Sequence, residues 1–282
     1  MQIESNFVVK SNHHNKPIVT DVIYKEDAIK KPIVIFCHGY KGFKNWGSWD
    51  LVAKTFAETN HFFIKFNFSH NGGTLENPVD FPDLEAFGEN NLTTELNDLE
   101  DVINWITANK KYKSEVDTTN ITLIGHSLGG GIAMIKASEN KNISKVISWN
   151  GVSDYGSRFP RGKDLEAWKK SGTSYVLNGR TKQEMPHEYQ FYKDFKENEE
   201  RLTIKTAIEN LNKPQLIVAG TSDEVVKPFE AENMHLWNPK SELALIDQMN
   251  HTLGSKHPWN KETLPIHLKK TVQVSIDFIA NN

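Results

Sequence analysis

The chain has 282 residues, of which 38% are hydrophobic and 24% are charged, as in an ordinary globular protein. Its formal net charge of −3 favours neither a nucleic acid nor an anionic membrane as partner. No apolar stretch approaches a membrane span, no signal peptide is visible at the N-terminus, and the single cysteine, Cys37, excludes an intramolecular disulfide. We therefore expect a cytoplasmic protein with Cys37 in its core.

The first half of the chain predicts alternating strands and helices. Strands are expected at residues 6–10, 18–24, 32–37 and 61–68. Helices are expected at residues 48–59 and 92–109, with a long loop at residues 69–91 between the strand and helix that flank it. The apolar runs 32–37 and 61–68 show no alternation with polar residues, which is typical of strands buried on both faces of a parallel sheet.

The second half continues this alternation after an interruption. A strand at 121–124, a helix at 128–138 and a strand at 145–149 come first. A strand at 214–219, a helix at 227–236, a strand at 242–246 and a helix at 265–279 come last. Between these groups the pattern changes, and only one helix, at 197–210, is predicted.

This order predicts an α/β fold with a mostly parallel central sheet and helices on both of its faces. Residues 1–150 and 211–282 form the two parts of one core. Residues 151–210 are expected to be a cap or lid over the carboxyl edge of the sheet, where sites in open α/β folds lie. Such a segment is long for an unstructured loop, so we expect it to be partly helical.

The segment Gly125-His126-Ser127-Leu128-Gly129 carries the strongest motif of the chain. It fits G-x-S-x-G, and a predicted strand precedes it and a predicted helix follows it, which is the context that a nucleophile elbow requires. A serine on so sharp a turn is held in strained backbone, and side chains two residues before or after it would collide with neighbouring chain. Ser127 is therefore the candidate nucleophile.

A serine becomes a nucleophile only when a base takes its proton and a carboxylate orients that base. On this type of elbow the chain order is serine, acid, histidine. Asp223 lies directly beyond the strand at 214–219, and His251 lies beyond the strand at 242–246. Both positions are carboxyl ends of strands, the same edge that Ser127 occupies, so we expect the three side chains to meet.

Other residues compete for the roles of acid and base. Glu224 and Asp154 are the alternatives to Asp223, and Asp223 itself could instead cap a turn. His257 and His235 are the alternatives to His251.

Four segments give the chain a resemblance to a known family. They are His38-Gly39-Tyr40, Gly125-His126-Ser127-Leu128-Gly129-Gly130, Gly220-Thr221-Ser222-Asp223-Glu224-Val225-Val226 and Asn250-His251. The chain resembles the α/β-hydrolase superfamily, in particular the carboxylesterase branch with cinnamoyl and feruloyl esterases and dienelactone-hydrolase-like proteins. Dienelactone hydrolases use a cysteine nucleophile where this chain has serine, so their substrate is not carried over.

The resemblance implies a set of site residues and an activity. Ser127 would be the nucleophile, Asp223 the orienting acid and His251 the base, and the backbone N–H groups of Tyr40 and Leu128 would form the oxyanion hole. The implied activity is hydrolysis of small to medium acyl or aryl esters, hydroxycinnamoyl esters included. The alternatives are a serine peptidase of the prolyl-oligopeptidase type and a non-catalytic binding protein.

The sequence implies no cofactor and no metal. The glycine run at 129–131 lacks the lysine and spacing of a phosphate-binding loop, and the histidine pairs lack partners at metal-ligand spacing. The expected partner is a small-molecule ester, and whether two copies form a homodimer is left open.

Overall fold

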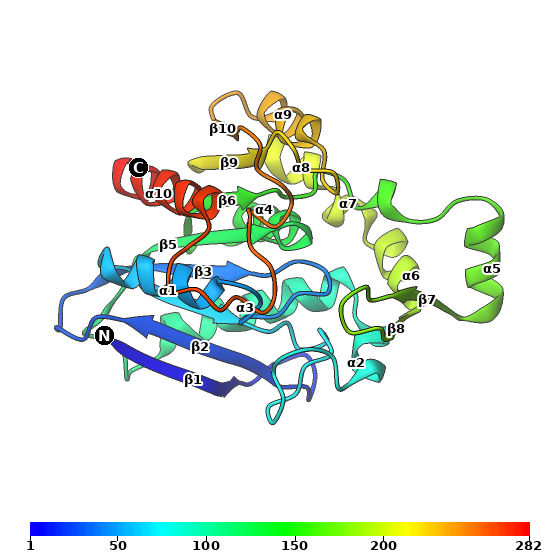
Figure 1. Ribbon diagram of the computed structural model, residues 1–282, viewed down its shortest axis with the longest axis horizontal. Coiled ribbons are helices and arrows are strands. Elements are labelled where there is room, and N and C mark those ends of the chain that lie inside the picture. Colours follow the sequence, from blue (N-terminus) through cyan, green and yellow to red (C-terminus); the bar gives the residue numbers. More distant parts are fainter.

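An eight-stranded sheet forms the centre of the computed structural model, which describes residues 1–282. The strand order is β1-β2-β4-β3-β5-β6-β9-β10 (Figure 1). The strands are β1 (Gln2–Val9), β2 (Ile18–Tyr24), β3 (Lys31–Cys37), β4 (Phe62–Phe66), β5 (Val116–His126), β6 (Ile143–Trp149), β9 (Gln215–Gly220) and β10 (Glu242–Ile246). The ladders from β4 to β10 are parallel, whereas β1–β2 and β2–β4 are antiparallel. The predicted mostly parallel sheet is thus confirmed.

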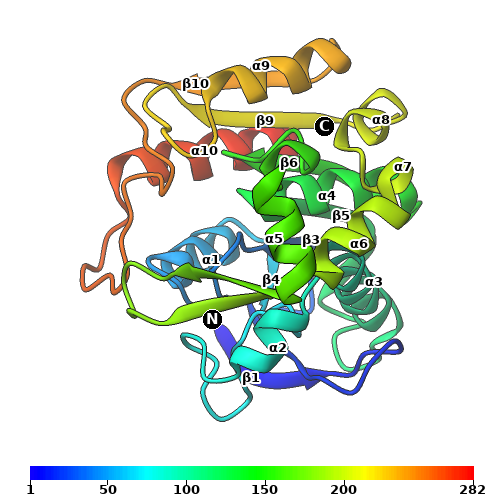
Figure 2. The same cartoon turned by 90° about the vertical axis from the view of Figure 1, so that its right-hand side faces the viewer.

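Helices cover both faces of this sheet (Figures 1 and 2). On one face α1 (Trp49–Glu58) and α10 (Ile266–Asn281) bury their apolar sides against the strands. On the other face lie α3 (Leu92–Ala108), α4 (Leu128–Glu139) and α9 (Pro228–Trp237). Strands such as β3 and β4 are buried between these layers, which explains their continuous apolar sequence. None of the helices combines the length and the apolarity that crossing a membrane requires.

Two predicted segments differ from the structure in their helices. The loop expected at 69–91 contains the short helix α2 (Leu84–Glu89), which the side chain of Asp83 caps by accepting a hydrogen bond from the Ala86 N–H. The helix α6 (Gln190–Glu197) ends where the helix expected at 197–210 was to begin, and the expected range instead holds two short helices, α7 (Glu199–Leu202) and α8 (Ile204–Glu209). Thr203 has extended backbone and separates the last two.

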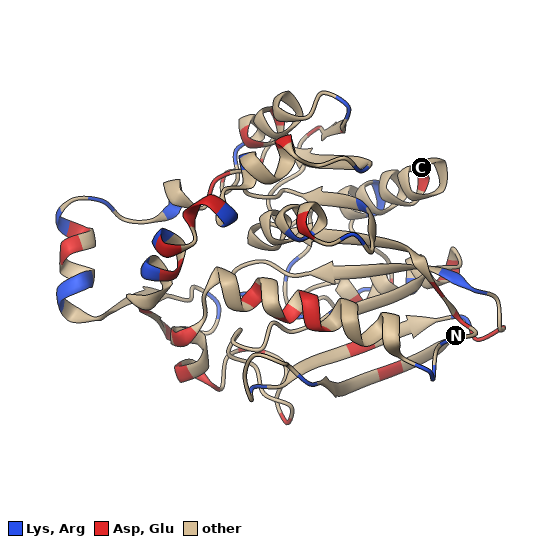
Figure 3. Cartoon of the chain, turned by 180° about the vertical axis from the view of Figure 1, so that it is seen from behind, with Lys and Arg blue, Asp and Glu red and all other residues tan.

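The segment between β6 and β9 has a structure of its own. After a 3₁₀ turn (Gly156–Arg158) come α5 (Lys163–Ser171) and an antiparallel hairpin of β7 (Thr173–Leu177) and β8 (Glu184–Glu188). Figure 1 shows α5 and the hairpin extending beyond one end of the sheet. Acidic residues lie in the first turn of α5 and basic residues in its last, so this projection carries both signs of charge (Figure 3). That residues 151–210 act as a cap is our proposal.

Aromatic side chains hold this segment together. Phe159 packs against Trp168, Phe191 and Phe195, with ring centroids 5.0 to 6.4 Å apart. Trp168 and Phe195 are each only 5% exposed. Phe195 belongs to the large hydrophobic core and Phe159 packs against it, and Phe159 and Trp168 also line the pocket described below.

Candidate active site

The elbow between β5 and α4 depends on its glycines. Ser127 has φ 57° and ψ −122°, a conformation that side-chain-bearing residues rarely adopt. A Cβ atom added to Gly125 would lie 2.1 Å from the Gly129 carbonyl oxygen, and one added to Gly129 would lie 2.4 Å from the His38 carbonyl oxygen. Because these contacts are with backbone, only glycine fits at either position.

Gly125→Ala is expected to lower the free energy of unfolding by about 3 kcal/mol or more, because overpacking against rigid backbone cannot relax. The matched control is Gly179→Ala, since a Cβ atom there would meet nothing within 4 Å. Urea unfolding of the two variants and the parent protein measures the difference. Equal stabilities for the two variants would contradict this account of the elbow.

Ser127, His251 and Asp223 form a chain of hydrogen bonds. The Oγ of Ser127 lies 3.0 Å from Nε2 of His251, and Nδ1 of His251 lies 2.8 Å from Oδ2 of Asp223. The three residues follow β5, β10 and β9, so parallel strands deliver them to one edge of the sheet. The structure therefore brings the three predicted side chains together.

The carboxylate of Asp223 is buried, and both of its oxygens accept hydrogen bonds. Its second oxygen, Oδ1, accepts hydrogen bonds from the backbone N–H groups of Val225 (2.8 Å) and Val226 (2.9 Å). Burial alone would raise the pKa of Asp223, but the hydrogen bonds from His251 and from these two N–H groups outweigh it and hold the pKa below its ordinary value. The side chain is therefore an anion placed to orient an imidazole.

The competing residues lie elsewhere or have other partners. The exposed carboxylates of Asp154 and Glu224 make no hydrogen bond within the protein. Nδ1 of His257 accepts a hydrogen bond from the Gly47 N–H, and His235 pairs with the hydroxyl of Ser241. None of these four side chains contacts Ser127 through a hydrogen bond.

The turn after β3 packs directly against the elbow. A Cβ atom on Gly39 would lie 2.8 Å from Cβ of Ser127, so the next residue, Tyr40, has its backbone beside the serine. The Tyr40 N–H donates no hydrogen bond within the protein. Leu128 is the first residue of α4, where an N–H has no acceptor inside the helix. Two free donors thus flank Ser127, as an oxyanion hole needs.

Two polar residues that the sequence did not single out support the histidine loop. Asn150 donates from Nδ2 to the carbonyl oxygens of Asn250 (3.0 Å) and His251 (3.1 Å), and its Oδ1 accepts from the Gly220 N–H (2.8 Å). His126 donates from Nε2 to the His251 carbonyl oxygen at 2.9 Å. Burial lowers the pKa of His126 to about 3, so its ring is neutral. The sequence signal that could have identified Asn150 is its position as a polar residue directly after the buried strand that ends at Trp149.

A pocket of about 350 Å³ opens beside Ser127. Eleven of its sixteen lining residues are hydrophobic, and most belong to the segment between β6 and β9 or to the N-termini of α3 and α4. The lining includes Tyr40, Leu128, Val152, Phe159, Trp168, His187, Phe191 and Val226. The Tyr40 hydroxyl lies 2.9 Å from Nε2 of His187 on β8, a contact that joins the turn after β3 to the hairpin.

No group of three His, Cys, Asp or Glu side chains in the chain could hold a metal ion.

Comparison with known proteins agrees with this fold. Residues 32–170 match the family model described as alpha/beta hydrolase fold. The chain thus has the α/β-hydrolase fold, and its predicted resemblance to proteins of that fold is confirmed.

Solved structures with this fold align over nearly the whole chain. Est1E from Butyrivibrio proteoclasticus with bound ferulic acid is 16% identical, with a TM-score of 0.71 over 98% of each chain. DcsB in complex with its substrate analogue is 15% identical, with a TM-score of 0.72 over 100% of this chain and 98% of that one. A dienelactone hydrolase from Anabaena variabilis is 15% identical, with a TM-score of 0.64 over 99% and 97%.

The sequence relatives match only part of the chain. An uncharacterized 31.7 kDa protein from the traX-finO intergenic region of Escherichia coli is 28% identical over 129 residues. That match covers 46% of this chain and 40% of the relative, so the chain spans about two fifths of the length of the relative it matches.

Proposed function

We propose that this protein is a serine hydrolase that cleaves carboxylic esters through an acyl-enzyme intermediate. The observation that carries the proposal is the hydrogen-bonded chain from Ser127 through His251 to the buried Asp223, beside an apolar pocket. A neutral imidazole with its Nδ1–H directed at a carboxylate presents the Nε2 lone pair to the serine hydroxyl. That arrangement is what makes an alcohol nucleophilic at neutral pH.

The reaction proceeds in two halves. Nε2 of His251 takes the Ser127 proton as Oγ bonds to the ester carbonyl carbon, and the N–H groups of Tyr40 and Leu128 hold the oxyanion. The His251 cation then protonates the departing alcohol oxygen as the carbon–oxygen bond breaks. A water molecule, deprotonated by His251, attacks the acyl group, and the proton returns to Oγ as the acid is released. These steps need no cofactor and no metal.

The pocket suggests which acyl groups fit. A volume of about 350 Å³ with mostly apolar walls suits small to medium acyl or aryl groups. Phe159, Trp168 and Phe191 offer aromatic faces to a flat ring. The fold similarity to Est1E, whose structure holds ferulic acid, adds hydroxycinnamoyl esters to the substrates worth testing.

Two measurements test the proposal. A fluorophosphonate probe should label Ser127 covalently, and a panel of 4-nitrophenyl esters with acyl chains of two to twelve carbons, together with methyl ferulate, should be hydrolysed with a preference for the shorter chains or the aryl acid. Cleavage of aminopeptidase substrates without cleavage of esters would favour a peptidase instead. Absence of both labelling and turnover would favour a binding protein.

Asn150→Gly is expected to lower kcat about 100-fold for 4-nitrophenyl butyrate with a smaller change in KM, because the loops that carry Asp223 and His251 lose their common support. Glycine accepts the φ of 46° at this position without strain. The buried Gly220 N–H is left without an acceptor, at a cost of about 2 kcal/mol of stability. Steady-state kinetics and urea unfolding separate the two effects. If the variant loses stability but keeps the kcat of the parent protein, Asn150 stabilises the fold and has no part in catalysis.

A further inference from the structure

A second, smaller pocket lies on another side of Ser127. Its volume is about 130 Å³, and its lining includes Lys41, Trp46, Trp49, Ser127, His251 and Thr252. His251 lines this small pocket but not the large apolar one, whereas Ser127 lines both. The two pockets therefore differ in their access to the imidazole.

This difference assigns a role to each pocket, given the proposed function. His251 must deliver its proton to the oxygen of the departing alcohol, so that alcohol has to lie on the imidazole's side of the serine. The small pocket thus receives the alcohol part of the ester, and the large apolar pocket receives the acyl part.

Lys41 gives the small pocket its chemical character. It is the only lysine or arginine of the lining, which contains no aspartate or glutamate. His38 and His126, which share the lining, are neutral because burial lowers their pKa values to about 4 and about 3. The small pocket therefore holds one positive charge and no negative one.

The ammonium of Lys41 has no anionic partner within the protein. It is half-buried and forms no salt bridge, and its Nζ lies 5.0 Å from the centroid of the Tyr40 ring. Burial lowers the pKa of Lys41. Arg158, in the large pocket, is instead neutralised by an ion pair with Glu230. Glu95 shares an adjoining cavity with Lys41, but burial raises its pKa to about 8, so it is uncharged at neutral pH.

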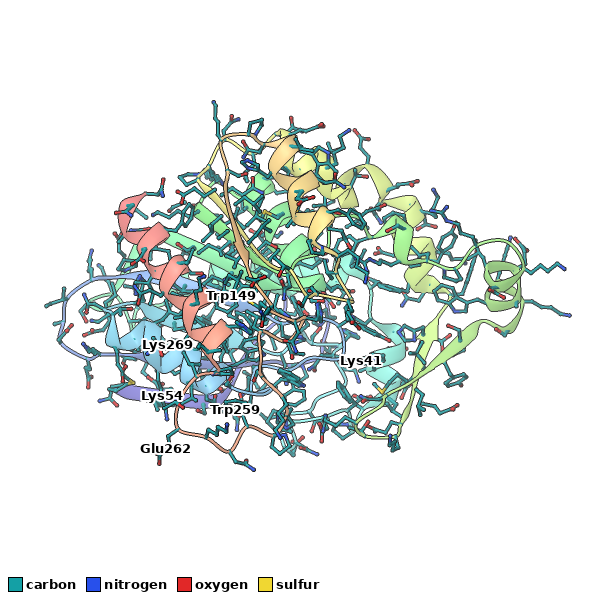
Figure 4. All side chains as sticks on the ribbon, turned by 45° about the horizontal axis from the view of Figure 1, so that its top comes forward. Lys41, Lys54, Trp149, Trp259, Glu262 and Lys269 are labelled. Carbon is teal, nitrogen blue, oxygen red and sulfur yellow. The ribbon has the colours of Figure 1, made fainter.

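The backbone at Lys41 has an unusual conformation. Its φ of 53° lies in the left-handed region, where a lysine is less stable than a glycine. Figure 4 places Lys41 on the side of the sheet that faces the β7–β8 hairpin. A half-desolvated ammonium without a counter-ion is stabilised when an anion binds beside it.

We propose that Lys41 binds an anionic group on the alcohol part of the substrate, so that the preferred esters are those of a carboxylate-bearing alcohol or phenol. The inference rests on the proposed ester hydrolysis and goes beyond it by naming the leaving group. An anionic group on the acyl part is not expected to bind Lys41, because the acyl part lies in the large pocket.

Three acetate and succinate esters test this inference in the full-length protein. 3-Acetoxybenzoate and 3-acetoxybenzamide carry the same acyl group and differ in the charge of the leaving phenol, whereas phenyl hydrogen succinate carries its charge on the acyl side. The ratio of kcat/KM for acetoxybenzoate over acetoxybenzamide should fall about tenfold or more in Lys41→Gln and be largely retained in Lys41→Arg. The control Lys54→Gln, an exposed lysine on α1, should leave the ratio as in the parent protein.

The outcomes distinguish failure of the role of Lys41 from failure of ester hydrolysis. An unchanged ratio in Lys41→Gln, with acetoxybenzamide still hydrolysed, overturns the role of Lys41 and leaves ester hydrolysis standing. A loss confined to phenyl hydrogen succinate overturns the assignment of the alcohol to the small pocket. If the parent protein hydrolyses none of the three esters and Ser127 is not labelled by fluorophosphonate, ester hydrolysis itself fails and the role of Lys41 fails with it.

Discussion

Ser127→Ala is expected to reduce kcat for 4-nitrophenyl acetate and butyrate by about a million-fold, to the limit of detection, while the protein stays folded. The loss is this large because the serine oxygen forms the bond to the substrate, and His251 and Asp223 have no function without it. Alanine has no atom to replace Oγ, and the turn that holds residue 127 depends on Gly125 and Gly129 rather than on the serine side chain. Initial rates and the circular dichroism spectrum of the variant are the measurements.

Ser222→Ala is the matched control for this experiment. Ser222 is an exposed serine one residue before Asp223, and its hydroxyl makes no hydrogen bond within the protein. Its replacement should leave the rate as in the parent protein. Turnover retained in Ser127→Ala would show that another group attacks the ester and would remove the proposed mechanism.

Local patterns were enough to predict most of the core. The run at 32–37 became β3, because an apolar stretch without polar alternation is typical of a strand that is buried on both faces of a parallel sheet. The elbow was equally local: its glycines, the preceding strand and the following helix lie within some twenty residues. Asp223 and His251 could be predicted as well, since chain order and the end of a strand both point to them.

Features that depend on distant contacts could not be predicted in this way. Asn150 supports loops that are 70 and 100 residues away, and only the adjacency of β6, β9 and β10 in the sheet brings these loops to its side chain. The β7–β8 hairpin was missed for a different reason. Tyr175, Val176 and Leu177 are all exposed. Because neither face of this strand is buried, its sequence does not alternate between apolar and polar residues.

Asp223→Asn is expected to lower kcat about 10⁴-fold, although the substitution changes the size of the side chain little. The reason lies in the two oxygens of the carboxylate. Oδ1 accepts from the N–H groups of Val225 and Val226, so an asparagine must keep its amide oxygen there and turn its NH₂ group toward His251. Two donors would then face each other unless His251 moved its proton from Nδ1 to Nε2. In that tautomer Nε2 carries a hydrogen and cannot accept the proton of Ser127.

Asp154→Asn separates this effect from a general loss of negative charge near the site. Asp154 was the sequence's main alternative as the acid, it follows the strand β6, and its carboxylate is exposed and makes no hydrogen bond. Its replacement should leave kcat for 4-nitrophenyl butyrate unchanged. If instead Asp154→Asn were the variant that lost activity and Asp223→Asn retained it, the orienting carboxylate would come from β6, and the hydrogen bond between Asp223 and His251 would have no part in catalysis. Because Asp223 alone combines burial, two backbone donors and contact with the imidazole, we expect the loss to fall on that variant.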